Sequence, residues 1–173
     1  LAAVSQAVRD CNMVVVSGGS SVGVRDHTVR VLIELGKTDV LFHGVAVKPG
    51  KPTIFGMVGK VPVFGLPGHP VAAMTVCAQI VKPAIQKLLC QVISASYTIP
   101  ARLSRSMASV PGRDDFIRVQ LIKKSGEYWA EPVLGKSGLI STMSTADGIV
   151  HIPADKGGLY SDEMVQVELI TKQ

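Results

Sequence analysis

The feature that most constrains the fold of this chain is an unbroken apolar run from Met13 to Val16. A strand with one solvated face alternates apolar and polar residues, so a run of valines indicates a strand covered on both faces, as in parallel sheets. Apolar residues at helical spacing lie on both sides of it, from Ala2 to Val8 and from Val29 to Leu35, the second face including Ile33. The pattern predicts an α/β fold with helices against a mainly parallel sheet.

Strands and helices of an α/β fold are predicted up to about residue 94. Val40 to Val47 is predicted as a strand, and Thr53 to Val58 and Val61 to Phe64 as two more, joined by a tight turn at Gly59-Lys60. A long helix is predicted to follow and to kink at Pro83. Its predicted core stripe consists of residues at helical spacing: Met74, Cys77, Val81, Ile85 and Leu88.

After residue 94 the sequence changes to short segments with two-residue alternation and no long helix. The candidate strands are Ile99 to Met107, Phe116 to Lys123, Tyr128 to Leu134, Gly148 to Pro153 and Met164 to Ile170. Five short strands predict a small barrel or sandwich. We therefore expect an α/β domain at residues 1–94 and an all-β, barrel-like domain at residues 95–173.

Composition limits the classes of function. With 173 residues, 47% hydrophobic and 18% charged, the chain can bury a core and is not disordered. Its longest apolar run, Val71 to Val81, is roughly half of the ~20 residues that a membrane helix needs, and the first ten residues lack the features of a signal peptide. A cytoplasmic protein is predicted. Cys11, Cys77 and Cys90 lack metal-ligand spacing and are predicted to be buried thiols.

The positive charge is unevenly distributed. Residues 1–94 hold nine Lys and Arg against four Asp and Glu, whereas residues 95–173 hold nine against nine. Only eight aromatic residues are present, and no run of Lys or Arg occurs. The excess therefore indicates a local anion site rather than a nucleic-acid surface.

Two glycine-containing loops follow predicted strands, where ligands bind in open α/β sheets. In the first loop, backbone N–H groups can converge on an anion, although an ordinary glycine-rich connection has the same composition. Its candidate residues are Ser17, Gly18, Gly19, Ser21 and Gly23. In the second loop, Pro67, Gly68 and His69 form a stiff approach to a ligand, with His69 expected to line the site rather than to act as an acid or base.

A third loop, Lys48-Pro49-Gly50-Lys51-Pro52, carries two lysines three residues apart on a stiff turn. Like charges repel, so this arrangement is favoured when a dianion lies between them, while a solvated turn is the alternative. Asp26 could hold a divalent cation against phosphate oxygens or cap a helix. Arg113 and a hydroxyl cluster that includes Ser137 could add anion contacts, but such loops are common on surfaces.

In order and spacing, three motifs resemble the molybdopterin molybdotransferase (MoeA/gephyrin) family. These motifs are Ser17-Gly18-Gly19-x-Ser21-x-Gly23-x-x-Asp26, Lys48-Pro49-Gly50-Lys51-Pro52 and Leu66-Pro67-Gly68-x-Pro70-Val71. The resemblance covers most of the chain, strongly to about residue 90. It implies a partial three-layer molybdopterin-binding domain, missing its N-terminal part, then a small β domain. It also implies a C-terminal fragment that is inactive alone and comes from a homodimeric protein.

The resemblance also implies an activity, the insertion of molybdate into adenylylated molybdopterin with release of AMP, which requires Mg²⁺. Asp26 matches the family's essential carboxylate and would hold Mg²⁺. Lys48, Lys51 and Pro52 match its molybdate pocket, and Arg113 and Ser137 align with further molybdate contacts. The glycine loop and the Pro67–His69 segment would bind the pterin substrate. No nucleic-acid or membrane partner is implied.

Three positions depart from the family pattern. His69 replaces the usual Asn, Ala72 replaces a usual Ser that contacts molybdate, and Val24 replaces a usual acidic residue. The preferred oxyanion, molybdate or tungstate, is therefore left open. Two other functions also remain: a related molybdopterin adenylyltransferase, which shares the GG-x-S loop, and a non-catalytic pterin-binding or scaffold module. The KPGKP motif and the β domain disfavour the adenylyltransferase.

Overall fold

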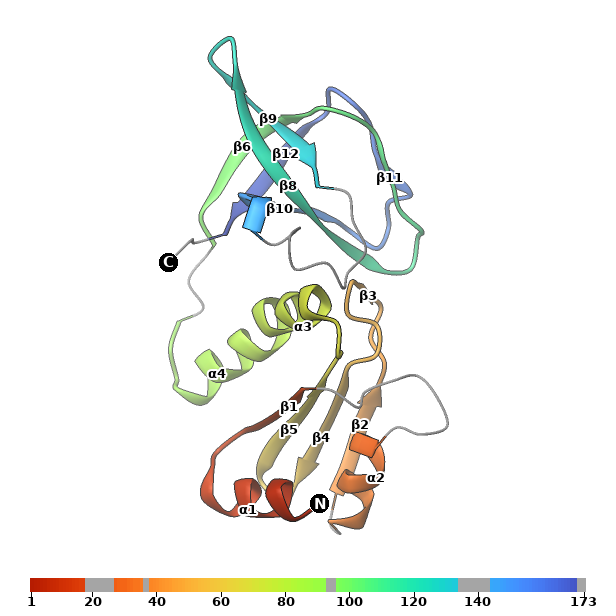
Figure 1. Ribbon diagram of the computed structural model, residues 1–173, viewed down its shortest axis with the longest axis vertical. Helices are drawn as coiled ribbons and strands as arrows, with labels where there is room; N and C mark the ends of the chain where they lie inside the picture. Colours follow the sequence, from red (N-terminus) through yellow and green to blue (C-terminus); the bar gives the residue numbers. More distant parts are fainter. Residues whose placement is uncertain (18–26, 36–37, 93–95, 134–143, 171–173) are drawn as a thin grey trace. The chain divides into compact units, whose positions relative to one another are not determined.

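The computed structural model describes residues 1–17, 27–35, 38–92, 96–133 and 144–170 (Figure 1). The chain forms two compact units, each with its own core. Unit 1 comprises Leu1–Val45 and Gly50–Cys90, and unit 2 comprises Ala46–Pro49 and Gln91–Gln173. The segment Ala46–Pro49 therefore leaves unit 1 and belongs to unit 2, although it lies within the first half of the sequence.

Unit 1 contains a four-stranded sheet in the order β1-β5-β4-β2. Its strands are β1 (Val14–Ser17), β2 (Thr38–His43), β4 (Ile54–Val58) and β5 (Val61–Leu66). β1 and β5 are parallel, whereas β4 is antiparallel to both β5 and β2. The expectation of a mainly parallel sheet is therefore only partly met. The reason is the tight turn at Gly59, whose φ of +61° suits glycine, because it folds β4 and β5 into an antiparallel hairpin.

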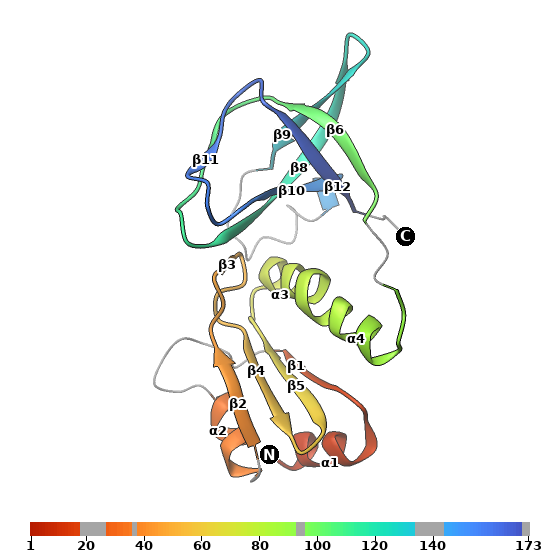
Figure 2. The same ribbon diagram turned by 180° about the vertical axis from the view of Figure 1, so that it is seen from behind.

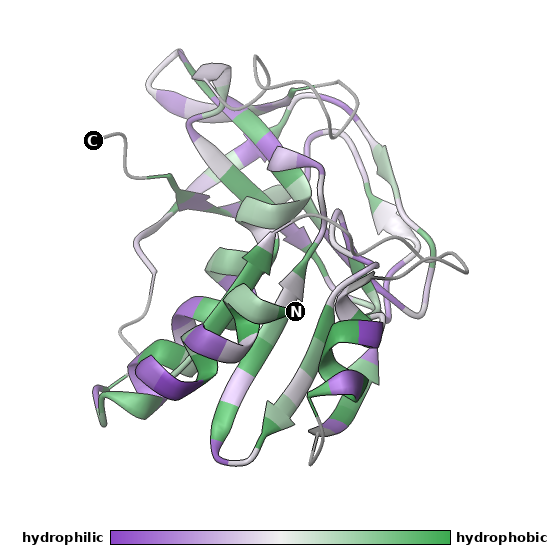
Figure 3. Cartoon of the chain, turned by 60° about the horizontal axis from the view of Figure 1, so that its bottom comes forward, coloured by the Kyte–Doolittle hydropathy of each residue, from purple (hydrophilic) through white to green (hydrophobic). Residues whose placement is uncertain are grey.

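Helices cover both faces of this sheet and produce the predicted three layers (Figures 1 and 2). On one face, α1 (Ala2–Asp10) and α2 (His27–Glu34) pack around a cluster of buried residues, Val14, Leu32, Ile54 and Val63. On the other face, α3 (Pro70–Val76), a π-helical turn (Cys77–Val81) and α4 (Lys82–Leu88) pack around Phe64, Leu66, Val76 and Val81. Figure 3 shows that these helices carry both hydrophilic and hydrophobic residues, as expected for helices with one buried face.

The predicted core stripe of the long helix is wrong at three positions: Met74, Ile85 and Leu88 are exposed. The buried residues of this segment include Val76 and Val81, which are five residues apart and lie at the two ends of the π turn. A π turn contains more residues than an α turn, so one α-helical phase cannot be carried through it. Pro83, which lacks a backbone N–H, follows this turn directly.

Two smaller expectations about burial are also wrong. Ile33 is exposed on α2, while Leu32 beside it is buried, so the inward face of this helix is narrower than its apolar residues indicate. Cys11 and Cys90 are exposed because they follow the ends of α1 and α4, and Cys77 is half-buried. Burial raises the pKa of the Cys77 thiol.

Unit 2 is a closed five-stranded barrel, as predicted. Its strands are β6 (Thr98–Leu103), β8 (Asp114–Lys124), β9 (Glu127–Pro132), β10 (Gly148–Ile152) and β12 (Met164–Leu169). They pair in the order β10-β12-β6-β9-β8, and β8 pairs back to β10, which closes the ring (Figure 1). The interior is filled by apolar side chains, among them Leu103, Val119, Val150 and Val167.

Two further pairs complete unit 2. β7 (Met107–Ala108) and β11 (Gly158–Leu159) form a two-stranded ribbon. β3 (Val47–Lys48) lies parallel to the beginning of β8, with Val47 opposite Asp114 and Lys48 opposite Asp115.

None of the helices within the described ranges has the length and apolar character that crossing a membrane requires.

Candidate functional site

The carboxyl ends of three strands of unit 1 lie at one edge of its sheet. Ser17, the last residue of β1, is paired with Leu66, the last residue of β5. Ile54, the first residue of β4, is paired both with Gly65 of β5 and with His43, the last residue of β2. The segments that follow Ser17, His43 and Leu66 therefore start side by side, at the kind of sheet edge where α/β proteins bind ligands.

The first of these segments is the predicted glycine loop. Ser17 is exposed at the end of β1, and α2 begins at His27. The remaining predicted residues of this loop lie outside the described residues: Gly18, Gly19, Ser21, Gly23 and Asp26. Their roles stay predictions, as does that of Ser137, which also lies outside the described ranges.

The segment after β5 leads directly into α3. Pro67 is buried, whereas Gly68 and His69 are exposed. His69 occupies the N-cap position with extended backbone, but its side chain makes no capping hydrogen bond, and Pro70 follows in the first helical turn. The imidazole is thus not engaged in capping the helix. Ala72, one of the departures from the family pattern, is buried.

The loop between β2 and β4 is closed by its own hydrogen bonds at the base. The N–H of Val45 donates to the carbonyl of Lys51 at 2.9 Å, and the N–H of Gly44 donates to that of Thr53 at 2.8 Å. The fully buried Thr53 hydroxyl donates to the carbonyl of Gly50 at 2.6 Å. Gly50 has a φ of +143°, which only glycine adopts readily. The Lys51 side chain stands exposed on this braced turn.

Lys48 belongs to unit 2, where it is part of a three-residue charge cluster. The Asp115 side chain is 2% exposed and accepts hydrogen bonds from Arg113, from Nε to Oδ1 at 2.8 Å and from Nη2 to Oδ2 at 3.4 Å. Lys48 Nζ lies 3.6 Å from Asp115 Oδ2, with the lysine side chain 57% exposed. The guanidinium of Arg113 is therefore paired, whereas the ammonium of Lys48 is held at one point and faces solvent.

Arg118, also on β8, was not among the residues that the sequence pattern indicated. It is 9% exposed, and its Nε is buried without a hydrogen-bond partner. Burial lowers the pKa of its guanidinium, because the charged form is separated from water. Since Arg118 is three residues beyond Asp115 on a strand, the two side chains project to opposite faces of β8.

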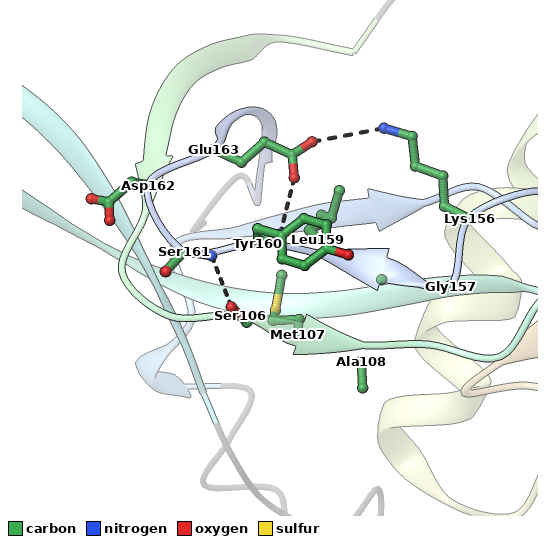
Figure 4. A pocket seen from close by; sticks show the side chains of 11 residues that line it. Ser106, Met107, Ala108, Lys156, Gly157, Leu159, Tyr160, Ser161, Asp162 and Glu163 are labelled. Atoms are coloured by element: carbon green, nitrogen blue, oxygen red, sulfur yellow. Dashed lines mark hydrogen bonds and ion pairs between the residues drawn. The ribbon is translucent and has the colours of Figure 1, made fainter.

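Unit 2 also contains a cavity of about 910 Å³ beside β7 and β11 (Figure 4). Two of its charged groups are paired, since Lys156 Nζ lies 3.8 Å from Glu163 Oε1, and the Tyr160 N–H donates to Glu163 Oε2 at 3.0 Å. None of the sequence-predicted site residues lines it. We assign it no role.

The residues that the structure describes do not supply a metal site. Within those ranges no three His, Cys, Asp or Glu side chains converge, and the carboxylate of Asp115 is already paired with two cations. Asp26, the expected Mg²⁺ ligand, lies outside them.

Comparison with known proteins gives consistent matches over nearly the whole chain. Residues 1–87 match the family described as "Probable molybdopterin binding domain", and residues 100–170 match "MoeA C-terminal region (domain IV)". A molybdopterin biosynthesis protein of Methanocaldococcus jannaschii is 37% identical over 97% of this chain and 39% of its own length. The molybdopterin molybdenumtransferase of Bacillus subtilis is 31% identical over 99% of this chain and 40% of its own.

A solved structure also resembles the chain. The molybdopterin biosynthesis MoeA protein of Pyrococcus horikoshii matches with a TM-score of 0.78 and 36% identity, over 99% of this chain and 40% of that one. The chain spans about two fifths of the length of these proteins.

Proposed function

We propose that this chain, which belongs to the family of MoeA-like molybdopterin molybdenumtransferases, is part of a molybdenum cofactor biosynthesis enzyme. It carries the parts of that enzyme that bind the pterin and the oxyanion. The reaction proposed for the whole protein is insertion of molybdenum from molybdate into adenylylated molybdopterin, with release of AMP. Because the chain spans about two fifths of its relatives, this activity is proposed for the full protein and not for the chain alone.

The observation that carries the proposal is the meeting of three strand ends at one sheet edge. Ser17 lies beside Leu66, and Ile54 lies beside both Gly65 and His43, so the three segments that lead into the motifs start next to one another. A molybdopterin substrate carries phosphate, and backbone N–H groups of glycine loops at such edges are suited to bind it. We propose that the glycine loop and the Pro67–His69 segment hold the pterin substrate there.

Lys48 and Lys51 are proposed as the cations for molybdate, with Pro52 beside them. Because the two lysines are three residues apart, their Cα atoms are separated by at most about 11 Å, whatever the loop conformation. Molybdate is a tetrahedral dianion, so two ammonium groups neutralise it and donate to its oxygens. The exposed ammonium ends and the braced base of the loop support this assignment.

Arg118 lies outside the proposed oxyanion site, because its side chain projects from β8 to the face opposite Asp115, the residue that pairs with Lys48. Arg113 stays a predicted molybdate contact, but its guanidinium would have to share an oxyanion with the carboxylate that it already contacts.

The finer features of the family remain part of the proposal: a requirement for Mg²⁺ with Asp26 as its ligand, a homodimer and a cytoplasmic location. Asp26→Ala is expected to abolish AMP release while leaving pterin binding largely intact. Isothermal titration with the pterin substrate measures the second property. Loss of pterin binding together with turnover would contradict the role assigned to this carboxylate.

Lys51→Ala tests the oxyanion loop. We expect the molybdate concentration for half-maximal AMP release by the full protein to rise about tenfold, the effect of losing one charge-assisted hydrogen bond. Lys60→Ala is the matched control, because Lys60 is an exposed lysine at the β4–β5 turn, at the opposite end of the hairpin from Ile54. An equal rise in both variants would refute a specific role for Lys51.

The same assay distinguishes the alternatives. Formation of the adenylylated pterin from ATP would indicate an adenylyltransferase, and binding of the pterin without turnover would indicate a scaffold. AMP release that depends on added molybdate supports the proposed reaction. Repeating the AMP-release assay with tungstate in place of molybdate determines whether Ala72 and His69 change the preferred oxyanion.

A further inference from the structure

We propose that Asp115 is a positioning residue of the oxyanion site, holding the ammonium of Lys48 at a fixed point while neutralising Arg113. This inference rests on the proposed function, since it assumes that Lys48 contacts molybdate. None of the sequence motifs includes Asp115, which is 67 residues away from Lys48 along the chain.

The backbone first brings the two residues together. β3 consists of only Val47 and Lys48, and it lies parallel to β8 with Lys48 opposite Asp115. The N–H of Asp114 donates to the carbonyl of Ala46 at 2.9 Å, which extends the pairing by one residue. Neighbouring residues of paired strands project to the same face, so the Lys48 side chain starts beside the Asp115 carboxylate.

The carboxylate then fixes the ammonium. Asp115 is almost fully buried, and both of its oxygens accept hydrogen bonds from the guanidinium of Arg113, which hold the carboxylate in place. Lys48 has four rotatable bonds in its side chain, and the 3.6 Å ion pair restricts them. Lys48 is still 57% exposed, so its remaining N–H donors are available to a ligand.

The direction in which molybdate binding changes when Asp115 is replaced distinguishes a positioning role from an effect of its charge. Asp115 is negative, so its charge alone opposes binding of a dianion, and removing it would tighten molybdate binding. Positioning has the opposite effect, because an unrestrained lysine loses conformational entropy when it binds. We expect positioning to dominate, since the charge of Asp115 is already compensated by two cations within 3.6 Å.

The test compares Asp115→Asn with Asp155→Asn in the full protein. Both variants remove one negative charge from unit 2, but Asp155 is exposed. We expect Asp115→Asn to raise the half-saturating molybdate concentration about tenfold, with the KM for the pterin substrate unchanged. Asp155→Asn should change neither value more than twofold. A lower or unchanged molybdate value for Asp115→Asn would overturn the inference.

A double-mutant cycle tests whether Asp115 acts through Lys48. In a Lys48→Ala background, Asp115→Asn should produce no further rise in the half-saturating molybdate concentration. A rise as large as in the wild type would show that Asp115 acts by another route and would overturn the inference. If Asp115→Asn does not fold, Asp115→Glu replaces it. We expect Asp115→Glu to raise the half-saturating molybdate concentration about threefold, and to cause no rise in the Lys48→Ala background. A rise that persists in that background would overturn the inference.

Failure of the inference can be told from failure of the proposed function. Equilibrium dialysis of the wild-type protein with molybdate, together with AMP release, tests the function itself. If the wild type neither binds molybdate nor releases AMP in response to it, the proposed function is wrong and the inference falls with it. If the wild type responds and Asp115→Asn behaves like Asp155→Asn, only the inference is wrong.

Discussion

Arg118→Met should stabilise the barrel. Arg118 is 9% exposed, and the substitution keeps most of the apolar stem of its side chain while removing a guanidinium whose buried Nε has no hydrogen-bond partner. An unsatisfied buried donor costs about 1–3 kcal/mol, more when charged, so we expect the free energy of unfolding to rise by about 1–2 kcal/mol. For a domain of this size, each kcal/mol corresponds to roughly 4–8 °C in Tm.

The sign follows from the pKa of Arg118. Burial lowers that pKa, so the charged form is less favourable in the folded barrel than in the unfolded chain, and removing the charge favours folding. Trp129 is the only tryptophan and lies in β9, so its fluorescence during urea denaturation reports on the barrel.

Arg105→Met is the matched control. The Arg105 guanidinium donates to the carbonyl of Pro132 at 2.8 Å, so the same substitution there should destabilise the barrel by about 1 kcal/mol. Opposite signs for the two arginines are therefore expected. If Arg118→Met lowers stability as Arg105→Met does, its guanidinium has a partner in solution and the reasoning about an unpaired buried cation is refuted.

Three further substitutions or treatments test other parts of the structure. Gly148→Ala should destabilise the barrel by about 1–3 kcal/mol, because a methyl group there would overlap the Val167 side chain; Trp129 fluorescence measures this. Thr53→Val should lower the stability of unit 1 by about 1–2 kcal/mol by removing a buried hydrogen bond at the base of the lysine loop, and proteolysis within the loop should become faster. Burial raises the pKa of the Cys77 thiol, so its alkylation by iodoacetamide should need a higher pH than that of exposed Cys11, as peptide mass spectrometry would show; equal pH profiles would contradict this.

Local signals in the sequence predicted most of the elements. The turn at Gly59-Lys60 and the five alternating segments of the second half correspond to a hairpin and a barrel. Strand direction was predicted less well, because the valine run of β1 indicates coverage on both faces and not the direction of its neighbours. The long helix was misjudged because nothing in the residues Cys77–Val81 distinguishes a π turn from an α turn.

The candidate site, like the fold, could be predicted only in part from local sequence. Loops that follow strands can be located from local sequence, and the strand ends that carry the three motifs do meet at one edge. The partners of charged side chains depend on strand pairing between distant segments. Asp115 meets Lys48 because β3 pairs with β8, and the buried Nε of Arg118 has no hydrogen-bond partner.

Two arginines, Arg113 just before β8 and Arg118 within it, show that a charged residue near a motif can already be paired in the fold. Arg113 directly follows Gly112 in a loop with motif-like composition, yet its guanidinium is held by both oxygens of a buried carboxylate. Arg118 lies within a strand and has no such partner. An oxyanion that binds Arg113 must therefore compete with the carboxylate of Asp115 for the guanidinium. Whether a charged side chain is available to a ligand thus depends on its pairing in the fold rather than on its place in the sequence.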